Sequence, residues 1–549
     1  MRHPVPPAKP GRGLAANPSP TAATDSLKQI AERIAERGAL FLVGRFFLGC
    51  CLAIVILCVT YQAFERPFHS WNDVRLTRTF ALFGNQEIYP SAEEGPILAG
   101  IYGPVGFAAY APATLFSSPN SALAAGVLLS IVMGFAPVLL ILLHPRLAPK
   151  AGRGMRILLV CYVFFHLYFS AAAFGLWNIH VDAPAVALCG LGLCGVLLHG
   201  TRTRFSWALG CSVLAFALAP WAKQTSAPLL LAPLLYLWTI GNRRAVFQFI
   251  AAFAVVECLL MAGFGAWFGF ERLYFSLMTV PAHHPRNIEQ LAFAGTQIED
   301  ILDMAALAAL VIFAACLPGQ QTSRPEGRPG AASFDWGAWP VFLVAALLAL
   351  PTSILGRIKD GGTDNNYALV DYFLTIAVAL CLLRLTALPS FRAHPVLPRV
   401  LPVTIGLLLC LQMLRTIPDV VRLPGQIAAF LRGSPSQQAY EAVREHPGKI
   451  YFPWHPLASL LAEGRLNHVT YGIYQRELAG FEVTREHLFR GLPASMQYVA
   501  VVGEIDPYTQ LVLPEYRCPA QIEGLSAWTV LGREHDGACA PPGSDSTVH

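Results

Sequence analysis

Long apolar runs, separated by short polar connections, make up most of this chain. A helix of about 17 to 25 apolar residues is long enough to cross the hydrocarbon core of a bilayer, which is about 30 Å thick. The pattern predicts about eleven such spans, near 39–61, 119–143, 156–175, 183–199, 205–221, 226–241, 245–267, 302–317, 337–354, 368–385 and 400–416. The shorter apolar segment 101–117 is predicted to lie at the interface or to re-enter the membrane. The chain is therefore predicted to be a mainly α, polytopic membrane protein.

The sequence before the first span has a different composition. Residues 1–24 are rich in Pro, Ala and Gly, which is typical of disordered segments. The stretch LKQIAERIAERGA (27–39) then places its Leu and Ile residues on one helical face. It is predicted to be a helix on the inner leaflet or a solvated leader. No small-residue cleavage site follows a short apolar core here, so we expect no cleavable signal peptide.

Polar and apolar positions are mixed after the last span. The stretches GKIYFPWHP (448–456) and QYVAVVGE (497–504) have the composition of buried strands, and SQQAYEAVREHP (436–447) is helix-like. Such a mixture predicts a small α/β domain outside the membrane, with a loose tail beyond Pro541. In chain order, the predicted parts are a partly disordered cytoplasmic leader (1–38), a transmembrane domain (39–417, with a long outer loop at 62–118) and this C-terminal domain (418–549).

Composition and charge agree with a membrane location. Only 13% of the 549 residues are charged, whereas soluble domains carry about 25%. With the N-terminus in the cytoplasm, the inner connections hold nineteen Lys and Arg residues and the outer ones hold eight. Because basic residues favour the cytoplasmic side, we predict an inner (plasma) membrane protein with an extracytoplasmic C-terminal domain. The net charge of +5 is scattered along these connections, so it indicates no nucleic-acid partner.

The cysteines fall into two groups. Eleven of the thirteen lie in or near the apolar spans and are expected to be small core residues. Cys518 and Cys539 lie in the C-terminal domain, where an oxidising compartment would allow them to pair. The sequence leaves that pairing open.

Polar and ionisable residues gather at the predicted outer ends of the spans. They include Asp73, Arg75 and Arg78, then Trp177, Asn178, His180 and Asp182, then Lys223 and Gln224, then His283, His284 and Arg286, and finally Arg357, Lys359, Asn365 and Asn366. The inner connections offer mainly single arginines and turn residues. Ionisable groups at membrane depth are costly and are usually functional. The sequence therefore predicts a polar cavity that opens outward at the membrane surface.

Several short motifs in this layout resemble one family. They are Asp73 at the start of the first outer loop, Gly84, Ile88-Tyr89-Pro90, Tyr102-Gly103-Pro104, Lys223-Gln224-Thr225 and Asn366-Tyr367. The pattern resembles the GT-C superfamily of multispan glycosyltransferases, of the protein O-mannosyltransferase and aminoarabinose-transferase type. The appended C-terminal α/β domain is similar to a soluble domain of many members. The family often has Asp-Glu where this chain has Asn72-Asp73, so a resident metal or other cofactor is not supported.

The resemblance implies transfer of a sugar from a polyprenyl-phosphate carrier to an extracytoplasmic glycan, lipid or protein, with inversion at the sugar. Asp73 would be the base that takes the acceptor proton, although it could simply cap a helix. Lys223, helped by Arg357 and Lys359, would stabilise the leaving phosphate, although lysine at a span end can also snorkel to the interface. The candidates for binding substrate or acceptor are His180, Asp182, Tyr102, Gln224, Asn366 and His283.

Three other functions fit parts of the same pattern. A transporter or flippase for lipid-linked glycans would be expected to show repeats and broken helices near the midplane, and neither is clear in this sequence. A polymerase or ligase of surface polysaccharide would share the donor and the compartment. A scaffold whose C-terminal domain binds wall components would need no catalytic residues.

Overall fold

The structure is a computed structural model that describes residues 20–98, 100–147, 152–290, 338–388, 391–392 and 397–533. Its contacts divide the chain into two units, Met1–Ala53 and Ile54–His549, which are described separately. The described part of the first unit belongs to helix α1 (Pro20–Glu65), which continues into the second unit. Residues 20–24 belong to the segment predicted to be disordered, but in the structure they are helical. The stretch is rich in Ala, Glu and Arg, which favour helix, and it joins the first apolar run without a break.

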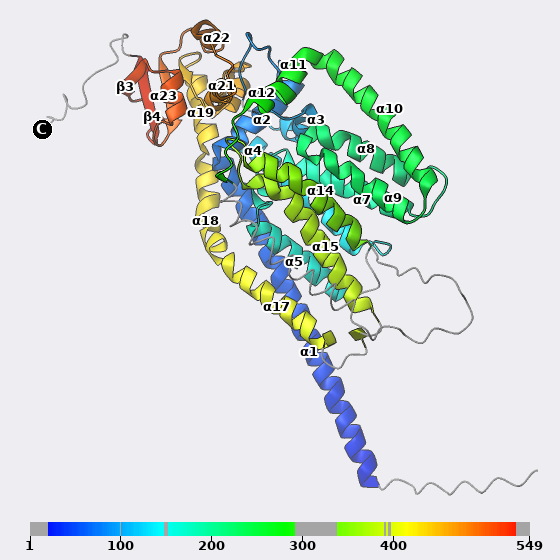
Figure 1. Ribbon diagram of the computed structural model, residues 1–549. Helices are drawn as coiled ribbons and strands as arrows, with labels where there is room; N and C mark the ends of the chain where they lie inside the picture. Colours follow the sequence, from blue (N-terminus) through cyan, green and yellow to red (C-terminus); the bar gives the residue numbers. More distant parts are fainter. Residues whose placement is uncertain are drawn as a thin grey trace, which may run out of the picture. The chain divides into compact units, whose positions relative to one another are not determined.

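Apolar helices make up most of the second unit (Figure 1). Besides α1 they are α4 (Pro119–Leu143), α5 (Arg153–Phe169), α7 (Asp182–His199), α8 (Trp207–Ala222), α9 (Leu231–Thr239), α10 (Arg243–Phe268), α14 (Trp339–Arg357), α15 (Ala368–Ala387) and α17 (Leu397–Arg415). Within the described residues, seven helical segments are long and apolar enough to cross a membrane. The predicted span 302–317 lies outside those residues. The mainly helical, multispan class is confirmed, and the count of about eleven stays a prediction.

Two helices form the centre of the bundle. Every residue of α15 from Ala368 to Leu383 is buried, and α7 packs between α4 and α8. Glycines in α7 allow this close approach, because a Cβ on Gly192 would lie 2.7 Å from the ring of Phe216. Small residues permit tight helix packing in membranes in the same way. The bundle thereby fixes the ends of α7 and α8, where several of the candidate residues lie.

The first outer loop is mostly short helices and irregular chain. It contains α2 (Ser70–Phe83), α3 (Pro104–Ala108) and the 3-10 helix η2 (Ala111–Leu115). The apolar helix expected at 101–117 is therefore divided into two short pieces. Most of α2 is buried, because it packs against α3 on one side and α20 (Pro456–Glu463) of the C-terminal part on another.

The C-terminal part is a small mixed sheet with helices. Strands β1 (Ile450–Tyr451), β2 (Tyr498–Val502), β3 (Tyr516–Ala520) and β4 (Trp528–Arg533) lie in the order β1-β2-β4-β3, with β1 parallel to β2 and the other pairs antiparallel. The helices are α18 (Ile417–Arg432), α19 (Pro435–Glu445), α20, α21 (Thr470–Leu478), α22 (Arg485–Arg490) and α23 (Pro507–Val512). The two predicted strands and the predicted helix at 436–447 are confirmed. Cys518 in β3 is disulfide-bonded, and Cys539 lies outside the described residues.

Candidate functional site

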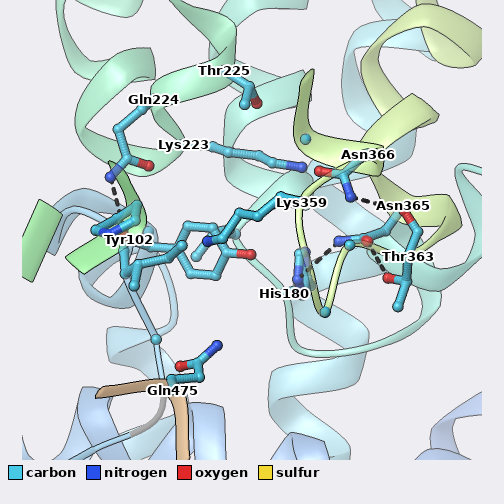
Figure 2. A pocket seen from close by; sticks show the side chains of 18 of the residues that line it. Tyr102, His180, Lys223, Gln224, Thr225, Lys359, Thr363, Asn365, Asn366 and Gln475 are labelled. Atoms are coloured by element: carbon cyan, nitrogen blue, oxygen red, sulfur yellow. Dashed lines mark hydrogen bonds between the residues drawn. The ribbon is translucent and has the colours of Figure 1, made fainter. Parts of the chain in front are cut away.

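A cavity of about 740 Å³ lies where the ends of several helices meet the C-terminal domain. Its walls come from α2 and the start of α3, the segment before α7, the 3-10 helix η3 (Gln224–Leu230), the loop after α14, and α21. Six of the residues predicted to bind substrate line this cavity: Tyr102, His180, Lys223, Gln224, Lys359 and Asn366. Figure 2 shows these side chains reaching the same space from different elements. The tertiary structure thus brings together residues that are up to about 260 positions apart in the chain.

Asp182 is the buried centre of a polar cluster beside the cavity. Its side chain is fully inaccessible to solvent and does not line the cavity. One carboxylate oxygen accepts a bond from the Lys223 ammonium, and the other lies 2.7 Å from His180 Nδ1. The amide of Asn365 also approaches, with Nδ2 3.4 Å from Asp182 Oδ2. The Lys223 charge is therefore already neutralised by a buried carboxylate.

The segment that carries His180 is held by hydrogen bonds. Tyr110 Oη donates to the His180 carbonyl at 2.7 Å and accepts from its backbone N–H at 3.0 Å. Asn72 of α2 accepts a bond from the Ile179 backbone N–H at 2.9 Å. Because buried polar groups are costly unless paired, these bonds fix the path of the chain just before α7. They also give Asn72 a structural role beside the cavity.

Lys359 lies on the loop that follows α14. This loop is paired with the segment before Asn287, because Asp360 N–H donates to the Pro285 carbonyl at 3.0 Å and Asn287 N–H donates to the Ile358 carbonyl at 2.7 Å. Burial lowers the pKa of Lys359 to about 8. The ammonium is therefore mostly charged at neutral pH, and no described carboxylate forms an ion pair with it.

Arg75 lines the cavity; the sequence analysis grouped it with the polar residues at the span ends but gave it no role in binding or catalysis. Its guanidinium lies 5.4 Å from the ring of Trp71 and 5.1 Å from the ring of Phe174. It forms no ion pair with any described carboxylate. Helical periodicity could have predicted that Arg75 faces the cavity, because Trp71, Val74 and Arg75 share one face of α2 and all line the cavity.

Asp73, the predicted base, is not brought to the cavity. It lies two positions from Arg75 on the same helix, so its side chain points to a different face. The carboxylate is fully buried against the C-terminal domain, and its Oδ1 accepts a bond from the Leu457 backbone N–H at 2.9 Å. Burial raises the pKa of Asp73 to about 7. Its role as base stays a prediction, and in this conformation the residue connects α2 to α20.

Arg357 and His283 also lie outside the cavity lining. Arg357 Nη1 donates to Gln290 Oε1 at 2.9 Å and to the Gly362 carbonyl at 3.0 Å, so it supports the loop that carries Lys359. His283 is exposed, with its ring centroid 5.4 Å from that of Phe481. Neither residue reaches the space that holds the other candidates.

The C-terminal domain contributes two residues that sequence reasoning missed. Tyr471 and Gln475, both on α21, line the cavity. The Tyr471 ring packs edge-on against Trp71 of α2, with centroids 4.7 Å apart. The sequence placed this domain outside the membrane and gave no indication that it reaches the cavity. Its contribution follows from the docking of α20 and α21 onto the first outer loop.

No metal centre is found in the part of the chain that the structure describes. There, no three His, Cys, Asp or Glu side chains gather closely enough to hold an ion. The prediction that the protein has no resident cofactor is not tested by this observation.

The chain was compared with known proteins by sequence and by fold. No family model and no curated protein sequence matches it. Among solved structures, it is similar to ArnT from Cupriavidus metallidurans bound to undecaprenyl phosphate, with 12% sequence identity and a TM-score of 0.50. The similarity covers 90% of this chain and 98% of that one. At this identity the likeness concerns the fold alone, and it shows that the chain has the fold of that solved structure.

Proposed function

We propose that this protein transfers a sugar from a polyprenyl-phosphate carrier to an acceptor outside the cytoplasm. The observation that carries the proposal is a pair of cavity cations without carboxylate partners, Arg75 and Lys359, in a GT-C fold. A leaving phosphate gains negative charge as the sugar departs, and fixed cations in a partly dry site stabilise that charge. The solved ArnT structure contains undecaprenyl phosphate, which supports a donor of the same class.

The cations divide the phosphate-binding role unequally. Lys223 is paired with buried Asp182, so it contributes less net positive charge to the cavity than an unpaired lysine would. Arg75 and Lys359 have no such partner among the described residues, and the planar guanidinium of Arg75 suits two phosphate oxygens. We therefore assign the phosphate to Arg75 and Lys359, with Lys223 as a neighbouring donor. The sequence prediction that Lys223 is the principal cation is modified accordingly.

The cavity also has a surface suited to a lipid tail. Met278 and Leu355 both line it, and each is 53% exposed. Leu355 belongs to α14, an apolar helix long enough to cross a membrane. A prenyl chain that follows these apolar side chains could remain in lipid while its phosphate reaches Lys359, and this apolar part of the lining favours a lipid-linked donor over a soluble one.

Two observations support an extracytoplasmic site. The Lys and Arg distribution along the sequence places the outer connections, which carry the cavity residues, away from the cytoplasm. The disulfide at Cys518 is typical of an oxidising compartment. We therefore place the cavity and the C-terminal domain on the outer side of the inner membrane.

The proposal is tested with purified protein and synthetic undecaprenyl-phosphate sugars carrying a hexose, a pentose or an amino sugar. A solubilised envelope fraction from a bacterial host supplies the acceptor. We expect release of undecaprenyl phosphate from at least one donor, and we expect Lys359→Ala and Arg75→Ala to slow it. If the wild-type protein cleaves no donor but moves an intact one across vesicle membranes, the transporter alternative is correct and the proposed transferase is not.

A further inference from the structure

His180 and Asp182 form a buried carboxylate–imidazole pair at the cavity wall. His180 Nδ1 lies 2.7 Å from Asp182 Oδ2. Two proton-free acceptor atoms would repel at that distance, so Nδ1 carries the proton and donates it to the carboxylate. The Asp182 backbone N–H also approaches Nδ1, at 3.3 Å, and this longer contact is the weaker of the two. The same tautomer leaves a lone pair on Nε2. The Asn365 amide lies 3.3 Å from Nε2, a distance at which its N–H donates weakly to that lone pair.

The orientation of the Asn365 amide follows from its neighbour Asp182, because a carboxylate only accepts hydrogen bonds and lies 3.4 Å from Nδ2. The amide nitrogen therefore faces Asp182 and His180, as Figure 2 shows for His180, and Thr363 Oγ1 donates to Asn365 Oδ1 on the other side. This assignment agrees with the proton on His180 Nδ1 and with an accepting Nε2. Burial lowers the pKa of His180 to about 4, so the ring is neutral at neutral pH and its Nε2 carries no proton.

Asp182 would stabilise the product of such a proton transfer. When a histidine takes a proton, a buried carboxylate on its other nitrogen holds the ring in place and offsets the new positive charge. Lys223 occupies only the second carboxylate oxygen of Asp182, so the bond to His180 is retained. In this cluster His180 is oriented by Asp182, as a general base would need to be. The alternative base, Asp73, faces the C-terminal domain.

We propose that His180, held by Asp182, is the base that accepts the proton of the acceptor hydroxyl during glycosyl transfer. This assignment rests on the proposed function. The acceptor oxygen forms a bond to the anomeric carbon while the bond from that carbon to the phosphate oxygen breaks. The acceptor proton goes to His180 Nε2, and the bond electrons leave with the phosphate, giving polyprenyl phosphate and an imidazolium. Arg75 and Lys359 stabilise the charge on the departing phosphate.

The first test replaces His180 by Gln, which keeps polar atoms but cannot act as a base at neutral pH. The rate of undecaprenyl phosphate release is measured with the donor panel and envelope acceptor described above. We expect His180→Gln to lower turnover by about 10²-fold or more and to change the affinity for undecaprenyl phosphate by less than about twofold. His283→Gln is the matched control, because His283 is an exposed histidine that lies outside the cavity lining.

A second variant separates proton transfer from structural support. His180→Ala leaves space beside Asp182, and added imidazole should restore turnover in a saturable way while undecaprenyl phosphate binding stays unchanged. This binding also reports whether each variant keeps an intact cavity. Turnover of His180→Gln above about a tenth of the wild-type rate would overturn the assignment, and so would a phosphate-binding His180→Ala protein that imidazole does not rescue.

Other carboxylates are compared in the same assay. Asp360 lines the cavity and Asp73 is the base that the sequence predicts. If Asp73→Asn or Asp360→Asn loses turnover while His180→Gln keeps it, that carboxylate is the base and His180 is not. If the wild-type protein cleaves no donor, the proposed function fails, and this assignment fails with it. Activity in the wild type and in His180→Gln together would overturn only the assignment of the base.

Discussion

The carboxylate of Asp73 and the backbone N–H of Leu457 are joined by a hydrogen bond of 2.9 Å, across 384 positions of the chain. Leu457 lies in the first turn of α20, where backbone N–H groups lack partners within the helix. A carboxylate at this end of a helix satisfies one of them and interacts favourably with the helix dipole. The bond connects the first outer loop to the C-terminal domain, and α21 of that domain supplies Tyr471 and Gln475 to the cavity.

We predict that Asp73→Asn keeps the fold and loses a component of pH-dependent stability. Burial raises the pKa of Asp73 to about 7 in the folded protein, above its unfolded value of about 3.9. The folded state therefore binds this proton more tightly, and the contribution is present at low pH and lost as pH rises to about 7. Asn still accepts the Leu457 bond and carries no charge. Thermal unfolding of both proteins from pH 5 to pH 8 measures the difference.

The stability of Asp73→Asn relative to wild type should increase across that pH range and level off above about pH 7. Asp73→Ala is the comparison, because it removes the acceptor for Leu457 and should be less stable than Asp73→Asn at every pH. A constant difference between Asp73→Asn and wild type would show that the Asp73 carboxyl does not titrate in this range.

We predict that binding of undecaprenyl phosphate weakens as the pH rises through about 8. The Lys359 ammonium loses its proton near that pH because burial lowers its pKa to about 8, and the neutral amine attracts phosphate less. Lys359→Ala should bind about tenfold more weakly at pH 7, the value of one lost charge-assisted bond. Its affinity should also vary less between pH 7 and pH 9. Titration calorimetry in detergent checks both effects, and Arg490→Ala is a control for general loss of positive charge, because Arg490 is exposed on α22 and lies outside the cavity lining.

We predict that breaking the Lys223–Asp182 pair is more harmful than removing both charges. Both side chains are buried, and Lys223→Met leaves the Asp182 charge without its cation. Uncompensated buried charges cost about 3–5 kcal/mol, whereas replacing both partners costs less. The Lys223→Met, Asp182→Asn double variant should therefore unfold at a higher temperature than Lys223→Met alone. Additive losses in the double variant would mean that the two side chains do not interact in the protein.

We predict that Gly103→Ala destabilises the cavity wall. A Cβ at position 103 would overlap the backbone carbonyl of Trp221, which cannot move without displacing the end of α8. Overpacking of this kind costs about 1–3 kcal/mol. Gly406→Ala in α17 is the control, because its Cβ meets nothing within 4 Å and Ala favours helix. A Gly103→Ala protein as stable as Gly406→Ala would contradict the close packing of α3 on α8.

Much of the fold was predictable because its signals are local. Apolar runs of membrane-spanning length predicted the helices around α4, α7, α14 and α15, and the short apolar run in QYVAVVGE predicted β2. The helix count was harder, because α9 has only nine residues and continues from a 3-10 segment. Pro228 lies in the 3-10 segment, because proline disrupts a regular α-helix. Apolar composition alone does not predict where such a run is divided.

The candidate site was predicted in part. His180, Lys223 and Lys359 lie at the outer ends of apolar helices, and their position in the sequence was sufficient to group them on one side of the membrane. Asp73 also lies next to an apolar span in the sequence. That position does not determine the face of α2 to which its side chain points. Tyr471 of the C-terminal domain reaches the cavity only because α21 docks there.

The sequence by itself determined the membrane class, the grouping of polar residues at helix ends and the elements of the C-terminal domain, since hydrophobic length, residue charge and strand composition are properties of neighbouring residues. Only the tertiary structure decided that Asp182 neutralises Lys223, that Arg75 and not Asp73 faces the cavity, and that the C-terminal domain closes one wall. These relationships depend on how helices rotate and pack against distant segments, and side-chain packing over the whole bundle sets that rotation.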